Sequence, residues 1–159
     1  MPWTFAHPAV VLPLQRLGLP LSALVAGSIA PDVPSYVPGL SIREWTHSWL
    51  GVVTIDLVLA LGVFALWTSW RRSQPTTREW QLAVPAVVIG SLTHVVWDAA
   101  THPDQWITNR VDWLREQHGP LLGHEWAQLI STVVGGLVVL AYLIWRRIGC
   151  QQVTSIRRD

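Results

Sequence analysis

The sequence predicts an all-α integral membrane protein with about three transmembrane helices and a short N-terminal helical hairpin. Half of its 159 residues are hydrophobic and only 13% are charged. The mean hydropathy is +0.33, which is typical of a small membrane protein. Three apolar stretches each reach about twenty residues, enough to cross a hydrocarbon layer of about 30 Å. We therefore expect a single membrane domain over residues 1–159.

Residues 1–46 are expected to form the hairpin and a following loop. Residues 4–15 and 22–30 suit two helices that are each too short to cross a bilayer, and Leu17-Gly18-Leu19-Pro20 separates them. A re-entrant or interfacial hairpin fits this pattern better than a span. Asp32 follows the second helix in a Pro-Asp pair, which is also a common turn dipeptide.

The three predicted transmembrane helices cover residues 49–70, 80–98 and 127–145. The first carries Asp56, a carboxylate that is costly at this depth and should therefore face the interior of the bundle. Its role, functional or structural, stays open. The third contains no charged residue.

The placement of arginine predicts the orientation. All eleven basic residues are Arg, and seven of them lie in the connection 71–79 and in the tail 146–159. By the positive-inside rule both segments are cytoplasmic, which leaves residues 1–48 and the loop 99–126 on the outer side. We expect a multi-pass protein of the cell (inner) membrane with a cytoplasmic C-terminus.

All the histidines lie in the predicted outer segments or at their membrane edge. They are His7, His47, His94, His102, His118 and His124. His94 and Asp98 stand one turn apart on one helix face, and imidazole with carboxylate is a donor set for zinc and similar ions. His102 follows on the same stripe, either as a ligand or as a spectator. A polar helix end, or histidines gathered at a polar surface, would be simpler interpretations; we favour a metal site.

Several short motifs resemble, in their order and over nearly the whole chain, a bacterial membrane-protein family called domain of unknown function 4184. These motifs are Ala6-His7, Ala30-Pro31-Asp32, Thr46-His47-Ser48, His94-x-x-x-Asp98 and Thr101-His102. The pattern is similar in turn to the membrane-bound metal-dependent hydrolases and, more remotely, to the zinc-dependent phospholipase C group. The hydrolase-like proteins usually have His-Arg-Gly before Thr-His-Ser, whereas this chain has Ile42-Arg43-Glu44-Trp45.

The resemblance implies a metal-dependent hydrolase of a lipid or another phosphoester, with the candidate ligands His7, Asp32, His47, His94 and Asp98. We expect it to act at the outer membrane face with a divalent metal, zinc being the expected ion. Asp32 or Glu125 is the predicted general base. Arg110 or Arg115 is placed to meet the charge of a phosphate.

Membrane lipid and a phosphoester substrate are the expected partners. Nucleic acid is excluded as a partner because the chain has no basic stripe, and the single Cys150 excludes a cysteine-built zinc site. The main alternative is a non-catalytic metal-binding or structural membrane protein, which a coordination sphere filled entirely by protein ligands would favour. A transporter is a weaker choice, because three spans enclose little of a path.

Overall fold

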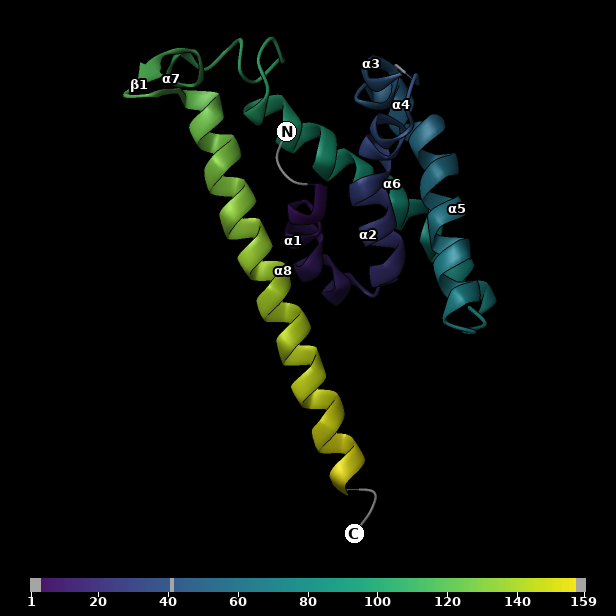
Figure 1. The fold of residues 1–159 in the computed structure, drawn as a ribbon. Helices are drawn as coiled ribbons and strands as arrows, with labels where there is room; N and C mark the ends of the chain where they lie inside the picture. Colours follow the sequence, from purple (N-terminus) through teal and green to yellow (C-terminus); the bar gives the residue numbers. More distant parts are fainter. Residues whose placement is uncertain (1–3, 41, 157–159) are drawn as a thin grey trace.

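The structure is a computed structural model in which residues 4–40 and 42–156 are described, and it is mostly helical (Figure 1). Short helices make up the first part of the chain: η1 (Thr4–Ala6), α1 (Pro8–Val11), η2 (Leu12–Leu17), α2 (Leu21–Ile29), η3 (Ala30–Tyr36), α3 (Arg43–Thr46) and α4 (Trp49–Val53). Longer helices follow, with a small helix and a hairpin before the last of them: α5 (Ile55–Trp70), α6 (Thr77–Thr101), α7 (Asp112–Arg115), β1 (Gln117–His118), β2 (Leu121–Leu122) and α8 (Gly123–Ile156).

Both predicted N-terminal segments are helical, and the chain reverses between them at Gly18. Its φ is 77°, a left-handed conformation that glycine adopts without strain. The Gly18 N–H closes the turn by donating to the carbonyl of Gln15 at 3.0 Å. After the turn, α2 packs against α5 and α6 and buries Ala23 and Leu24 beside Val87 of α6 in the core.

Two glycines allow α2 and α6 to cross with their backbones in contact. A Cβ atom on Gly27 would lie 2.2 Å from the carbonyl oxygen of Val87, and one on Gly90 would lie 2.3 Å from that of Leu24. The hydroxyl of Ser91 crosses the same contact and donates to the carbonyl of Gly27 at 3.1 Å. Small residues permit this approach, as they do between helices in membranes. The contact brings α2 against the face of α6 that carries the candidate ligands.

The predicted span 49–70 is not one continuous helix. It breaks at Thr54, where φ is −124° and ψ is −88°, and the Thr54 hydroxyl donates to the carbonyl of Leu50 at 2.6 Å. The resulting α5 has 16 residues and rises about 24 Å, less than a usual membrane crossing. Asp56, in its first turn, is fully buried, so it faces the interior as predicted. Neither of its carboxylate oxygens has a hydrogen-bond partner among the described residues.

Two helices in the described part of the chain are long and apolar enough to cross a membrane. They are α6 and the stretch Gly123–Ile148 of α8. Both extend past the predicted ranges 80–98 and 127–145. α8 continues as a helix through the predicted tail as far as Ile156, and residues 157–159 lie outside the described residues.

A capping box explains why α6 begins earlier than predicted. The hydroxyl of Thr76 accepts from the backbone N–H of Glu79 at 3.2 Å, and the Glu79 carboxylate accepts from the N–H of Thr76 at 2.8 Å. Two N–H groups that the first turn of a helix cannot satisfy are thereby bonded. The helix therefore starts within the polar connection and not at the first apolar residue.

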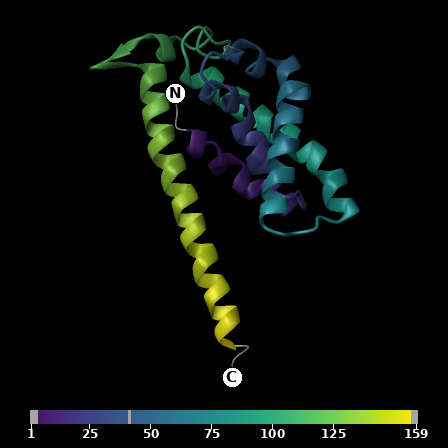
Figure 2. The same cartoon turned by 45° about the vertical axis from the view of Figure 1, so that its right-hand side comes forward.

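α8 stands apart from the other helices along much of its length (Figures 1 and 2). It contacts η1, α1 and α6, and the close approach occurs at Gly135, where a Cβ atom would lie 2.9 Å from the Cβ of Ala6. Its apolar side chains are largely uncovered, with Leu137 and Trp145 exposed by 60% and 68%. An apolar helix with so little protein around it suits a lipid environment.

The predicted outer loop 99–126 contains more structure than the all-α prediction included. β1 and β2 form an antiparallel hairpin in which Gln117 pairs with Leu122 and His118 with Leu121. Gly119, with φ of 71°, makes the turn. This hairpin and α7 lie at the start of α8 (Figure 1).

Candidate metal centre

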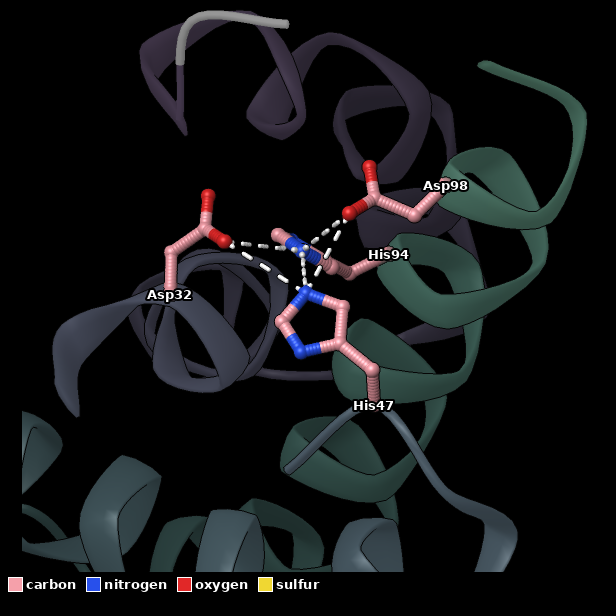
Figure 3. Close-up of side chains that lie close together, drawn as sticks. All are labelled: Asp32, His47, His94 and Asp98. Carbon is pink, nitrogen blue, oxygen red and sulfur yellow. Dashed lines mark hydrogen bonds and ion pairs between the residues drawn. The ribbon is translucent and has the colours of Figure 1, made fainter. Parts of the chain in front are cut away.

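Side chains from three separate segments meet in one buried group. Asp32 comes from η3, His47 from the residue that follows α3, and His94 and Asp98 from α6 (Figure 3). Each offers one ligand atom, and no two of these four atoms are more than 4.8 Å apart. Figure 3 shows both imidazoles pointing between the two carboxylates. We call Asp32, His47, His94 and Asp98 the four-residue group.

The distances within the four-residue group suit a tetrahedral ion. The Nε2 atoms of His47 and His94 are 3.3 Å apart. Nε2 of His47 lies 3.5 Å from Asp32 Oδ1 and 3.2 Å from Asp98 Oδ2, and the same distances for His94 are 3.5 and 3.6 Å. Ligands on tetrahedral zinc with bonds of about 2.0–2.1 Å are separated by about 3.3–3.4 Å. Four ligand atoms form six pairs, and the five distances given above are close to what such an ion requires.

The other nitrogen of each imidazole is held by the backbone. Nδ1 of His94 donates to the carbonyl of Ser28 at 2.8 Å, and Nδ1 of His47 donates to the carbonyl of Arg43 at 3.1 Å. In a neutral imidazole this arrangement places the proton on Nδ1 and leaves the lone pair of Nε2 facing the centre. Metal-binding histidines are usually oriented in this way.

Asp32 is fixed by a chain of hydroxyl groups. The hydroxyl of Thr4 donates to Asp32 Oδ2 at 2.6 Å and lies 2.7 Å from the hydroxyl of Tyr36. Burial alone would raise the pKa of Asp32, but hydrogen bonds with His47, His94 and Thr4 outweigh it and hold the pKa well below its usual range. Asp32 is therefore an anion whose second oxygen, Oδ1, faces the centre and the imidazoles of His47 and His94.

His47 titrates in the opposite direction. Burial lowers its pKa, but hydrogen bonds to the carboxylates of Asp32 and Asp98 outweigh burial and raise the pKa above its usual value. In the absence of a metal ion the group therefore holds a proton on His47 between two anions. A metal ion has to displace that proton in order to bind.

His7 and His102 border the four-residue group without being part of it. The ring of His7 stacks on that of His94 at 3.9 Å, and its Nε2 lies 3.6 Å from Asp98 Oδ1. Both His7 Nε2 and Asp98 Oδ1 are buried, and neither atom has a hydrogen-bond partner within the described residues. Burial, aided by the charge of His94, lowers the pKa of His7 to about 3, so this imidazole is neutral. His102 Nδ1 lies 3.5 Å from Asp98 Oδ2, and burial lowers the His102 pKa as well.

Arg43 is the residue at this site that the sequence interpretation did not single out. Its Nη2 donates to Asp98 Oδ2 at 2.9 Å, and its Nη1 donates to Asp32 Oδ1 at 3.3 Å. Nη2 also lies 3.4 Å from Nε2 of His102. The signal that could have found it is its position in the stretch Ile42-Arg43-Glu44-Trp45, just before Thr46-His47-Ser48.

The remaining candidates lie in the outer loop and at the start of α8, with other partners. The Glu125 carboxylate accepts from the N–H of Leu122 at 2.7 Å. Arg110 donates to the carbonyl of Trp106, and Arg115 pairs with Asp112. His118 lies 2.9 Å from the carbonyl of Trp113, and His124 lies 3.0 Å from that of Leu114. None of these side chains belongs to the four-residue group, and the roles predicted for Glu125, Arg110 and Arg115 stay predictions.

A cavity of about 220 Å³ borders the four-residue group. Among the residues that line it are Arg43, His47, Asp98, His102 and Gln105. Two candidate ligands, His47 and Asp98, thus also line the cavity. A molecule in this cavity would lie directly beside the candidate metal position.

These features define a class of protein. The chain is helical, two of its helices could span a membrane, and its buried histidine and aspartate group could hold a metal ion. It belongs to the family described as Domain of unknown function (DUF4184), which it matches over residues 1–73 and 68–158. No curated protein and no solved structure matches the chain.

Proposed function

We propose that the protein is a membrane-bound metal-dependent hydrolase that acts on a phosphoester of a lipid or of another molecule at the outer membrane face. The observation that carries this proposal is the four-residue group, in which five ligand separations of 3.2–3.6 Å surround one point. The resemblance to membrane-bound metal-dependent hydrolases and to the phospholipase C group supports the same reaction class.

The donor set favours zinc among the divalent ions. Two imidazole nitrogens and two carboxylate oxygens are ligands that zinc accepts in tetrahedral geometry, and the two carboxylates together balance its charge. When bound, such an ion would lower the pKa of a water molecule and polarise a phosphoryl oxygen. The protein would orient the ligands, through Ser28 for His94 and through Thr4 for Asp32, and would admit the substrate through the bordering cavity.

The proposed topology has three crossings, made by α4 with α5, by α6 and by α8. Burial of Asp56 within the bundle supports α5 as a crossing, since a charge at that depth should avoid lipid. The exposed apolar surface of α8 supports lipid contact, and Arg146 and Arg147 follow the apolar part of that helix. By the positive-inside rule these arginines are cytoplasmic, and the four-residue group lies toward the outer face.

Metal analysis and hydrolysis assays on detergent-purified protein test the proposal. The wild type should hold about one zinc ion per chain and release phosphate or an alcohol from some member of a panel of phospholipids and soluble phosphoesters. Asp98→Asn keeps the shape of the side chain but removes a negative charge, so it should lose both metal and activity. His102→Ala, a change just outside the group, should keep its metal. Full metal content in Asp98→Asn would remove Asp98 from the coordination sphere.

A second candidate function is a non-catalytic metal-binding protein. One observation favours it: four protein ligands fill a tetrahedral zinc site, as in structural zinc sites, whereas catalytic sites keep one position for water. Cobalt(II) in place of zinc distinguishes the two functions. A hydrolase should show a visible spectrum that changes when inorganic phosphate is added, because the anion enters the coordination sphere. A tetrahedral cobalt spectrum unaffected by phosphate would support the structural function.

A further inference from the structure

Arg43 contacts the same two oxygens that face the candidate metal position. Its guanidinium donates to Asp98 Oδ2 at 2.9 Å and to Asp32 Oδ1 at 3.3 Å. These are the atoms that lie 3.2–3.6 Å from the Nε2 atoms of the two histidines of the group. The guanidinium therefore offsets one of the two negative charges of the buried carboxylates while no metal ion is bound.

A divalent ion at the centre would change the electrostatic environment of the Arg43 guanidinium. The carboxylate oxygens would then share their lone pairs and their charge with the ion, so their attraction for the guanidinium would weaken. The guanidinium would also lie next to a second positive charge. An arginine is charged at every physiological pH, so it cannot escape this repulsion by losing a proton. It needs another anion nearby.

The bordering cavity gives that anion a place. Arg43 lines this cavity, and its side chain is 34% exposed, so part of the side chain is uncovered at the cavity. The volume of about 220 Å³ equals roughly seven water molecules at about 30 Å³ each. That space suits a phosphoryl group and is smaller than the pockets of about 300–1,000 Å³ that hold drug-sized ligands.

The chemistry of the cavity wall also fits a phosphoryl group. A guanidinium presents parallel N–H groups that match two phosphate oxygens, which a single ammonium does not. Among the described residues, Arg43 is the arginine that hydrogen-bonds to the four-residue group. A phosphate held by Arg43 would lie beside Asp98 and His47, which line the same cavity, and so beside the ion.

We propose that Arg43 is the anion-binding residue of this site. It holds Asp32 and Asp98 together while the metal is absent, and it binds the phosphoryl oxygens of the substrate once the metal is bound. This inference deepens the proposed function and rests on its metal site, but it does not depend on the hydrolytic step. Because binding free energies are coupled in both directions, phosphate should tighten the binding of zinc, and zinc that of phosphate.

The phosphoryl group could belong to a lipid headgroup or to a soluble phosphoester. Exposed tryptophans lie near this end of the molecule, and Trp49 contacts Trp106 with ring centroids 6.1 Å apart. Tryptophan side chains favour the level of the lipid headgroups. The test therefore has one arm for each source of phosphate.

The experiment measures zinc affinity of the full chain in a phosphate-free maltoside detergent, against a competing chelator at fixed pH. Each protein is titrated alone, with inorganic phosphate, and with phosphatidic acid added to the micelles. The wild type should bind zinc more tightly with at least one of the two probes, by roughly 5- to 150-fold. The probe that produces the change identifies the source.

Arg43→Gln tests the assigned residue. It removes the competing charge, so its zinc affinity without phosphate should equal or exceed that of the wild type, and the effect of phosphate should vanish. Arg43→Lys keeps the charge but loses the paired N–H groups, so the effect should shrink. Arg78→Gln is the matched control, because it removes an exposed arginine from the opposite end of α6; it should behave as the wild type.

Several results would overturn the assignment. One is a wild type that binds zinc but shows no coupling to either probe, which leaves the proposed metal site standing. Another is undiminished coupling in Arg43→Gln, or its loss in Arg110→Gln instead. A third is an Arg43→Gln protein that circular dichroism shows to be folded but that no longer binds zinc. A wild type that binds no zinc at all would overturn the proposed metal site together with this assignment.

Discussion

The backbone carbonyl of Ser28 accepts a hydrogen bond of 2.8 Å from Nδ1 of His94. Ser28 belongs to α2 and His94 to α6, so the bond joins the two helices that cross at Gly27 and Gly90. It also aims Nε2 of His94 at the carboxylates of Asp32 and Asp98. The orientation of one candidate ligand is thus set by how closely two helices approach.

Replacing His94 should remove a ligand, whereas replacing a similar buried histidine should not. In His94→Gln we expect zinc affinity to fall by at least about 100-fold, since even loss of a residue that only supports a ligand costs 10- to 100-fold. His124→Gln is the control, because His124 is also buried and its Nδ1 also bonds to a backbone carbonyl, that of Leu114. Competition with a chelator measures the zinc affinity of both variants. Equal affinities in the two variants would contradict the assignment of His94.

The crossing of α2 and α6 should not tolerate a methyl group. In Gly90→Ala the new Cβ would lie 2.3 Å from the carbonyl oxygen of Leu24 and 2.8 Å from the backbone nitrogen of Ser28. We expect a loss of about 1–3 kcal/mol in the free energy of unfolding and weaker zinc binding, because the contact of Ser28 with His94 shifts.

Gly62→Ala is the matched control for this prediction. Gly62 lies in α5, and nothing is within 4 Å of the position of its Cβ. This substitution should leave zinc binding unchanged and should stabilise the helix by up to about 1 kcal/mol, as alanine favours a helix over glycine. Thermal unfolding followed by circular dichroism compares the two variants. A Gly90→Ala protein as stable as Gly62→Ala would show that the helices do not cross so closely.

Zinc binding should release a proton near neutral pH. The pKa of His47 is raised above 6.5 by Asp32 and Asp98 despite its burial, so at pH 6.5 the metal-free imidazole is mostly protonated. Affinity should therefore rise as the pH increases through the raised pKa of His47. Asp32 contributes no proton in this range, because its pKa is held below its usual value.

Isothermal titration calorimetry in buffers of different ionisation enthalpy measures this proton directly. At pH 6.5 the uptake of zinc should release protons, that of His47 among them. The same titration at a pH well above the raised pKa should release fewer protons and serves as the internal comparison. Binding that is independent of the buffer at pH 6.5 would mean that His47 is neutral before the metal arrives.

The orientation in the membrane can be tested with fused reporters. A fluorescent protein that matures only in the cytoplasm should be active after Asp159 and within residues 71–76. Alkaline phosphatase, which is active only outside, should work when inserted at Gly119, the tip of the hairpin. These outcomes follow from the concentration of arginines at one side. Phosphatase activity after Asp159 would reverse the sidedness of the site.

The sequence was most informative where apolar length alone decides the structure. α6 and α8 contain the predicted ranges 80–98 and 127–145, and membership of the DUF4184 family is confirmed. The boundaries were less accurate, because hydropathy does not register the capping box of Thr76 and Glu79 or a helix that continues into polar residues. The break at Thr54 was not predicted, since no proline or glycine occupies that position.

The residue types of the candidate site could be predicted from the sequence, but not which of the candidate residues would face its centre. Periodicity placed His94 and Asp98 on one face, and motifs pointed to Asp32 and His47. Which of the neighbouring histidines faces the centre depends on how segments far apart in the sequence pack against one another. The place of Arg43 depends on how α3, which begins at this residue, packs against η3 and brings the guanidinium to Asp98 of α6, which no local pattern encodes.

The order of residues in the chain also bears on how the protein is made. The members of the four-residue group lie between Asp32 and Asp98, whereas α8 begins at Gly123. Because chains fold from the N-terminus as they leave the ribosome, η3, the segment around His47 and α6 can meet while the last long helix is still being synthesised. A metal ion bound by the group would fasten these segments together during synthesis, so that the supply of that ion would affect the yield of the protein.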